Sequence, residues 1–74
     1  MTEMEESVYR VFESVLGAGP VAGQNFFDLG GDSLMALEVA TGVEESLGCA
    51  FPLEQLFETG DIDAVVASVT KQLS

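Results

Sequence analysis

The side chain best placed for chemistry is the hydroxyl of Ser33. It closes an acidic turn with two adjacent glycines, in the segment Phe26-Phe27-Asp28-Leu29-Gly30-Gly31-Asp32-Ser33-Leu34. Gly30 and Gly31 allow the backbone to bend without a Cβ clash. Asp32 is a good N-cap, because its carboxylate can accept from the free N–H groups of a first helical turn. An apolar helical pattern follows at once, so we expect Ser33 at the first helical position with its hydroxyl directed outward. Such a hydroxyl is part of the structure, a cap, or a point of attachment.

Catalysis by Ser33 itself would need a base to accept its proton, and this base is usually histidine. The chain has no histidine, and its only lysine, Lys71, lies near the far end of the sequence. These facts exclude a Ser-His-Asp site and disfavour a Ser-Lys site. We therefore expect no catalytic residues and no enzyme activity. If Ser33 reacts, a group outside this protein must activate it.

Metal binding is not expected either. A chain without histidine and with the single cysteine Cys49 lacks the ligands of a zinc site. Asp28-x-Gly30-x-Asp32 looks like the start of a calcium loop, but Val39 occupies the twelfth position, where a bidentate glutamate is needed. Cys49 has no intrachain partner for a disulfide, and we interpret it as a packing residue.

Length and charge limit the class of protein. A chain of 74 residues makes one small domain, expected over residues 1–74, with a thin core. Thirteen acidic residues against two basic ones give a net charge of −11, which argues against nucleic acid and anionic membranes and for basic protein partners. A hydrophobic fraction of 47% favours a folded core over a disordered acidic tail. No signal segment or membrane-length apolar run is visible, so we expect a cytoplasmic monomer.

Three longer helices are expected around this turn. The first has Thr2 and Glu5 as a capping box, an apolar stripe and Gly17 as its end. The second runs from about Ser33 to Leu47. The last of the three longer helices, which follows a short helix described below, begins after Asp61 as its cap. The three stripes are, in order, Met4, Val8, Val11, Phe12, Val15 and Leu16; Ala36, Ala40, Val43 and Leu47, with Leu34, Leu37 and Thr41 beside them; and Ile62, Val65, Val66, Val69 and Leu73.

The remaining segments complete an all-α, four-helix bundle. A short helix is expected from Leu53 to Glu58, with Pro52 in its first turn and Leu53, Leu56 and Phe57 on its buried side. Residues 17–32 form a long loop, which at least one of Phe26 and Phe27 should pin to the core. Gly42 lies inside the second helix at a cost of about 1 kcal/mol relative to alanine, which the close approach of a neighbouring helix would justify.

The segment Leu29-Gly30-Gly31-Asp32-Ser33-Leu34 resembles the attachment motif of acyl and peptidyl carrier proteins. The doubled glycine and the Phe26-Phe27-Asp28 lead-in are more similar to peptidyl carriers of nonribosomal peptide synthesis than to fatty-acid carriers, which usually have one glycine there. The resemblance extends from about Met4 to Leu73. It leaves open a free-standing carrier or a piece of a larger synthetase.

The resemblance implies a covalent cofactor. In this family the serine carries 4′-phosphopantetheine from coenzyme A, whose thiol holds aminoacyl or peptidyl groups as thioesters. Ser33 would be the attachment site, with Asp32 and Gly31 beside it. The implied partners are a phosphopantetheinyl transferase, an adenylation enzyme or domain, and downstream condensation, tailoring or thioesterase enzymes.

Partner docking should occur beside the attachment site, on Leu34, Met35 and Glu38. We expect Met35 at an exposed position, where a flexible thioether adapts to several enzymes. Fatty-acid carriers usually have an acidic residue there, so this docking helix would not be purely electrostatic. Two alternatives remain: an acyl carrier of polyketide or fatty-acid synthesis, and an acidic helical interaction module that is never modified.

Overall fold

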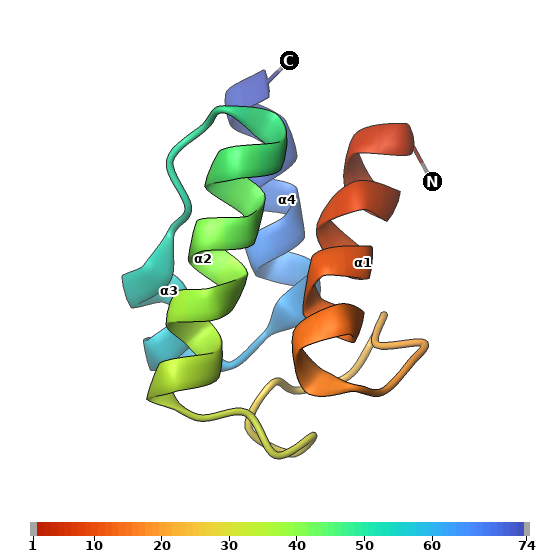
Figure 1. Ribbon diagram of the computed structural model, residues 1–74, viewed down its shortest axis with the longest axis vertical. Coiled ribbons are helices and arrows are strands. Elements are labelled where there is room, and N and C mark those ends of the chain that lie inside the picture. Colours follow the sequence, from red (N-terminus) through yellow and green to blue (C-terminus); the bar gives the residue numbers. More distant parts are fainter. Residues whose placement is uncertain (1, 74) are drawn as a thin grey trace.

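The computed structural model describes residues 2–73 and, within that range, has four helices and no strand. They are α1 (Glu3–Leu16), α2 (Ser33–Leu47), α3 (Leu53–Thr59) and α4 (Ile62–Leu73). Helix α1 packs against α2 and α4, and the short α3 contacts both α2 and α4 (Figure 1). The predicted all-α bundle is confirmed. None of these helices is long and apolar enough to cross a bilayer.

The long loop closes one end of the bundle. Figure 1 shows residues 17–32 running beneath the helices, at the end where α2 begins. Both labelled chain ends lie at the opposite end. The first residue of α2 is therefore far from the termini, at a corner built by the loop.

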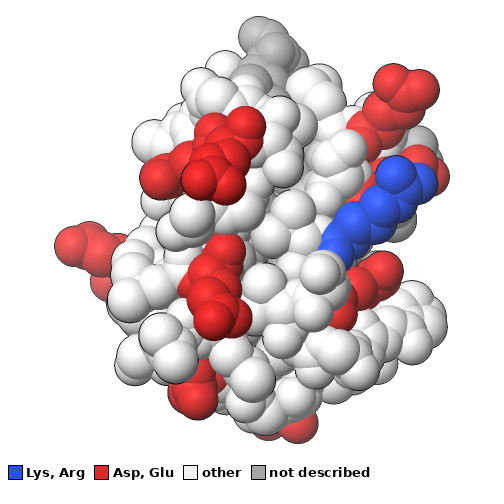
Figure 2. Space-filling view, viewed as in Figure 1, with Lys and Arg blue, Asp and Glu red and all other residues white. Residues whose placement is uncertain are grey.

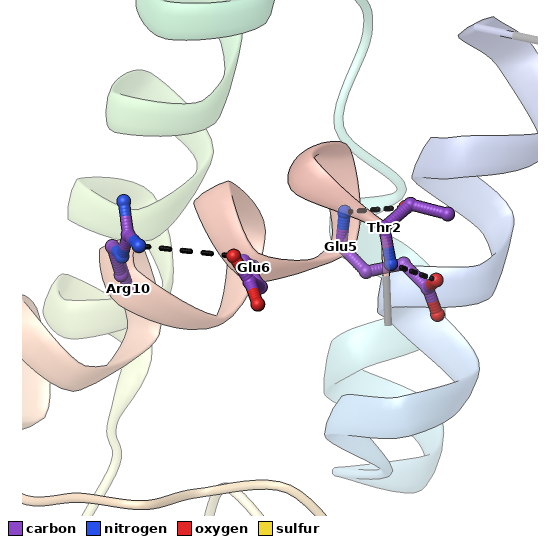
Figure 3. A network of polar contacts seen from close by, with 4 residues as sticks. All are labelled: Thr2, Glu5, Glu6 and Arg10. Atoms are coloured by element: carbon purple, nitrogen blue, oxygen red, sulfur yellow. Dashed lines mark hydrogen bonds and ion pairs between the residues drawn. The ribbon is translucent and has the colours of Figure 1, made fainter.

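Helix α1 has the ends that the sequence predicts. Thr2 N donates to Glu5 Oε1 at 3.0 Å, and Glu5 N donates to Thr2 Oγ1 at 3.2 Å, which completes the capping box (Figure 3). Gly17 is left-handed, with φ of 65°, and its N–H donates to Glu13 O. The exposed pair Arg10–Glu6, 3.8 Å apart, adds little to stability because solvent screens it.

The core combines residues from all four helices and from the loop. Its buried members are Val8, Tyr9, Phe12, Val21, Phe26, Ala36, Val39, Ala40, Val43, Phe51, Leu56, Ile62, Val65, Val66 and Val69. Phe12 is at its centre, with ring contacts to Phe26 at 5.9 Å and to Phe51 at 6.1 Å between centroids. Val39, part of the apolar pattern expected after Ser33, is buried as well, whereas no role was predicted for Tyr9 or Val21.

Helix α2 has the predicted bounds but buries only one of its two expected stripes. Ala36, Ala40 and Val43 are buried, whereas Leu34 and Leu37 are 66% and 51% exposed. The neighbouring helices cover one side of α2 only, so the second stripe faces solvent. The expected close approach at Gly42 is confirmed, because a Cβ there would lie 2.9 Å from Val11 Cγ1.

Helix α3 differs in detail from its prediction. It ends at Thr59, one residue later than expected, and Pro52 is its N-cap rather than a residue of its first turn. Leu56 is buried, but Phe57 is 41% exposed, so its assignment to the buried side was wrong. Successive helical residues differ by about 100° in direction, and a two-turn helix cannot bury both.

Helix α4 begins as predicted. Asp61 Oδ1 accepts from Ala64 N at 3.1 Å and acts as the N-cap. Ile62, Val65, Val66 and Val69 are buried, which confirms the helical stripe despite its β-branched residues. The side chain of Leu73, the last expected member, lies outside the described residues.

Candidate functional site

Ser33 is the first residue of α2 and is exposed. Among the described residues, its hydroxyl has no hydrogen-bond partner. It is therefore neither a buried structural group nor the cap of the helix. The hydroxyl is accessible at this corner to a group from outside the protein.

Asp32 takes the capping role. Its Oδ1 accepts from Met35 N at 2.9 Å, and its backbone carbonyl accepts from Ala36 N at 2.9 Å. The residue is extended, with φ of −136°, as a residue preceding a helix should be. Because Asp32 satisfies the helix end, the side chain of Ser33 is not needed there.

The two glycines before Asp32 are required for different reasons. Gly30 has φ of 90°, a region that L side chains rarely adopt. Gly31 has an ordinary φ, but a Cβ on it would overlap the ring of Phe26. Its N–H also donates to Phe26 O at 3.0 Å. The bend thus depends on Gly30 for its dihedral angle and on Gly31 for close packing.

Phe26 pins the loop to the core, as predicted for one of the two rings. It is fully buried and meets Phe12 edge-on. Phe27 is 42% exposed, with its ring centroid 5.5 Å from that of Phe26. The buried ring holds the turn, and the second ring covers it and faces solvent.

Asn25 organises the turn, a role that the sequence patterns did not predict. Its Oδ1 accepts from the N–H groups of Phe27 at 2.9 Å and Asp28 at 3.3 Å. Its Nδ2 donates to Thr59 O at 3.2 Å, across a chain separation of 34 residues. The first pair of bonds is an Asx turn, a known habit of asparagine before a turn, which was a usable signal. The contact with Thr59 had no signal in the sequence.

Tyr9 and Asp63 form a second contact that was not predicted. Tyr9 Oη donates to Asp63 Oδ1 at 2.6 Å, and Gly23 N donates to the same oxygen at 3.0 Å. Burial, followed by the bond to Asp63, raises the pKa of Tyr9 to about 12. The bonds from Tyr9 and then Gly23 lower the pKa of Asp63. The three residues join α1, the loop and α4.

The three predicted docking residues differ in exposure. Leu34 and Glu38 are exposed, but Met35 is half-buried and packs against the core. The expectation of an exposed Met35 was therefore wrong. Met35 lies about 100° round the helix from Leu34, on the side covered by the bundle. The other large exposed apolar side chains among the described residues are Phe27, Leu37 and Phe57.

The charged surface agrees with an acidic protein. In Figure 2 the acidic side chains are spread over the visible face, and basic atoms appear only along α1. Within residues 2–73, no three acidic or cysteine side chains gather closely enough to hold a metal ion. On the face that Figure 2 shows, the negative charge is dispersed and does not gather at one place.

Comparison with known proteins identifies the family. Residues 6–69 match the family described as "Phosphopantetheine attachment site". The chain is 43% identical over 68 residues to polyketide synthase PksN of Bacillus subtilis, covering 88% of this chain and 1% of that protein. It is 36% identical over 69 residues to tyrocidine synthase 2 of Brevibacillus parabrevis, covering 92% and 2%. It is also 36% identical over 66 residues to surfactin synthase subunit 3 of B. subtilis, covering 88% and 5%.

These matches cover most of this chain but only a small part of each relative. No solved structure matches it significantly. The family match over residues 6–69 identifies the class of this chain as a carrier domain, and a small helical bundle is consistent with it. The chain belongs to the phosphopantetheine attachment family, whose members carry covalently attached 4′-phosphopantetheine.

The residues around Ser33 fit such a group. The hydroxyl is exposed and has no partner among the described residues. It lies at the N-terminus of a helix of 15 residues, where N–H groups and the helix dipole favour an anion. The first turn of α2 contains no acidic residue that would oppose a phosphodiester. Asp32 does lie next to it, so a flexible arm that extends into solvent suits this corner.

Proposed function

We propose that this chain is a peptidyl carrier domain and that Ser33 is its attachment residue for 4′-phosphopantetheine. One observation carries the proposal. The serine of the Gly30-Gly31-Asp32-Ser33-Leu34 motif is exposed at the start of α2, and Asp32 performs the capping in its place. The match over residues 6–69 supports residues 1–74 as a single carrier domain.

The family resemblance implies the reaction that loads Ser33, and the groups that this chain lacks indicate what the transferase must supply. The Ser33 oxygen attacks the β-phosphorus of coenzyme A, a new P–O bond forms, and adenosine 3′,5′-bisphosphate leaves. The chain has no histidine, so a base of the transferase must take the hydroxyl proton. When bound, the group supplies a terminal thiol, which holds acyl groups as thioesters. This chain therefore presents the hydroxyl, and the transferase supplies the catalysis.

Asp32 and Gly31 support the corner in different ways. Asp32 orients the first turn through its bond to Met35 N, and its charge is available to a transferase with its magnesium. Gly31 lets the turn lie directly on Phe26. We assign both to the attachment site because they set the direction in which the hydroxyl points.

Partner enzymes dock on the exposed side of α2 beside Ser33. Leu34 and Glu38 are exposed there, and Leu37 lies one turn after Leu34. Met35 is half-buried beside them, so part of its side chain packs against the core and the rest remains available to a partner. Phe27 on the loop and Phe57 on α3 offer further apolar contact. The partners are the transferase, an adenylation enzyme or domain, and downstream condensation, tailoring or thioesterase enzymes.

A second candidate has a specific observation behind it. The identity of 43% to polyketide synthase PksN favours an acyl carrier as the alternative to a peptidyl one. The resemblance of the doubled glycine and the Phe26-Phe27 pair to peptidyl carriers weighs for the first candidate. In this proposal either kind of carrier works in the cytoplasm as a monomer. Sedimentation of the isolated chain tests the oligomeric state.

Intact-mass spectrometry tests both candidates. After incubation with coenzyme A, magnesium and a broad-specificity transferase, we expect the mass to rise by one phosphopantetheine group. Ser33→Ala should abolish the increase, and Ser46→Ala, on the same helix, should retain it. The modified protein is then offered to adenylation enzymes with amino acids and to acyltransferases with acyl-coenzyme A. Aminoacyl loading supports the peptidyl carrier and acyl loading the alternative, whereas no mass increase would support an unmodified interaction module.

A further inference from the structure

We propose that Asn25 is a positioning residue, which ties the turn before Ser33 to the junction between α3 and α4 and so presets the surface that a transferase recognises. This inference rests on the proposed role of Ser33. It adds a residue that lies eight positions before the serine and outside the attachment motif.

The first link is the internal order of the turn. Asn25 Oδ1 accepts from Phe27 N at 2.9 Å and Asp28 N at 3.3 Å, and Asn25 O accepts from Leu29 N at 3.2 Å. One residue thus gathers three of the following N–H groups. An unpaired N–H at any of these positions would have to find water or another partner. Asn25 therefore determines how the chain folds back towards Gly30.

The second link is the attachment of this turn to the rest of the fold. Asn25 Nδ2 donates to Thr59 O at 3.2 Å, and Phe26 N donates to Gly60 O at 2.7 Å. Asn25 also forms an isolated bridge with Asp61. A Cβ on Gly60 would lie 2.8 Å from Asn25 Oδ1, so the two segments are in close contact. The turn cannot shift along the α3–α4 junction without losing these bonds.

The third link leads from the turn to Ser33. Gly31 N donates to Phe26 O at 3.0 Å, and Gly31 packs directly on the Phe26 ring. Asp32 follows at once and caps α2. The turn that Asn25 orders is thus connected to the first residue of α2 through the contact between Phe26 and Gly31 and through the cap residue Asp32. On the other side, Thr59 is the last residue of α3, two residues after the exposed Phe57.

The consequence is a preset arrangement of three exposed groups. Phe27 on the turn, Leu34 on α2 and Phe57 on α3 come from three segments, and Asn25 bonds to two of these segments. A partner that touches the turn and α3 together binds without first ordering them. Loss of the Asn25–Thr59 bond transfers that ordering cost to each binding event.

The test variant is Asn25→Asp, which keeps acceptors for Phe27 and Asp28 but cannot donate to Thr59 O. Asn25→Ser is a second variant, because a hydroxyl can accept from Phe27 N but is too short to reach α3. Ser68→Ala is the matched control, since it removes the 2.8 Å Ser68–Gln55 bond between α4 and α3 away from the turn. Each protein is incubated with coenzyme A and the transferase to obtain kcat and KM for the carrier. Backbone hydrogen exchange at Phe26 and Gly31 is measured on the same unmodified proteins.

We expect both Asn25 variants to raise KM by about threefold to tenfold, the effect of one lost hydrogen bond, with kcat within about twofold of the unmutated chain. Exchange at Phe26 and Gly31 should accelerate in both. Ser68→Ala should change neither quantity beyond about twofold. Unchanged KM and exchange in the Asn25 variants, or an equal rise of KM in Ser68→Ala, would overturn the inference. Failure of the unmutated chain to gain mass would refute the role of Ser33 instead, and exchange at Gly31 would still decide whether Asn25 orders the turn.

Discussion

At the scale of single residues, the corner before Ser33 depends on two glycines that cannot replace each other. Gly30 supplies a backbone angle, with φ of 90°. Gly31 supplies empty space, because the Phe26 ring occupies the position that a side chain would need. The two adjacent glycines look equivalent in the sequence, but each meets a different structural requirement.

Alanine at each glycine should show this difference. Gly31→Ala is expected to lower the free energy of unfolding by about 1–3 kcal/mol, because the core ring of Phe26 must move. Gly30→Ala should cost about 1–2 kcal/mol through its left-handed backbone alone, since no atom lies within 4 Å of the added Cβ. Urea denaturation measures both values. Near-ultraviolet circular dichroism should change for Gly31→Ala only, and an unchanged aromatic signal there would contradict the packing explanation.

At the scale of elements, α2 is a helix with two apolar stripes, of which only one is buried. Leu34 is 66% exposed, whereas its neighbour Met35 packs against the core. Exposed leucines at a helix start add no stability to the isolated bundle. Their exposure is explained if partner enzymes bind to these leucines one after another, because a carrier must contact several enzymes.

Truncating these two neighbours should separate recognition from stability. Leu34→Ala is expected to change the unfolding free energy by less than about 0.5 kcal/mol, and to raise the transferase KM several-fold. Met35→Ala should lower stability by about 1–2 kcal/mol, less than for a fully buried methionine. Denaturation and loading kinetics are measured on the same samples. A stable Met35→Ala protein with impaired loading would restore Met35 as a direct docking residue.

At the scale of the whole molecule, α1, the loop and α4 meet at one carboxylate. Tyr9 and Gly23 both donate to Asp63 Oδ1. The pKa of Asp63 is lowered, chiefly by the bond from Tyr9, so ionised Asp63 stabilises the fold. The pKa of Tyr9 is raised to about 12, chiefly by burial, so its protonated form is the one that the fold favours.

The pH dependence of stability should follow from these two directions. The Asp63 contribution is full above the unfolded pKa of about 3.9 and is lost as pH falls through the lower folded value. The Tyr9 contribution is full below about pH 10 and is lost as pH rises towards 12. Between about pH 5 and 9, the free energy of unfolding of Tyr9→Phe should therefore be lower than that of the unmutated chain by at most about 1 kcal/mol. The value is at most this large because solvent at the exposed Asp63 weakens the bond.

The matched measurement is thermal or urea unfolding of both proteins from acid to alkaline pH. The stability difference between them should shrink at either end of the range. Because phenylalanine keeps the ring and lacks only the hydroxyl, a difference that stays constant from about pH 3 to pH 11 would contradict a role for the ionised Asp63 and the protonated Tyr9 in this bond.

Much of this architecture was predictable because it depends on neighbours along the chain. The caps at Thr2, Asp32 and Asp61, and the helix end at Gly17, involve bonds within four residues. The helical period also identified Val8, Phe12 and the stripe of α4 as core. The position of Ser33 at the start of α2 is equally local. Its choice as the candidate attachment residue rested in addition on the resemblance of the segment from Leu29 to Leu34 to a family motif.

The residues that were misjudged depend on which helix face a neighbour covers. Phe57 and Leu37 were placed on apolar stripes but are exposed, whereas Met35 was placed outside the stripes but packs against the core. Periodicity does not say how wide the covered side of a helix is. In a bundle this small, one or two neighbours cover each helix, so adjacent apolar residues can have opposite environments. The bonds from Asn25 to Thr59 and from Tyr9 to Asp63 were missed because they span 34 and 54 residues.

The sequence by itself thus determined the helices, their caps and the serine at the start of α2, because each follows from contacts within one or two turns. Only the tertiary structure decided which side of α2 meets solvent, and which distant groups hold the loop against the bundle. Those outcomes depend on helices packing in three dimensions, where residues far apart in the chain compete for the same limited space in the core.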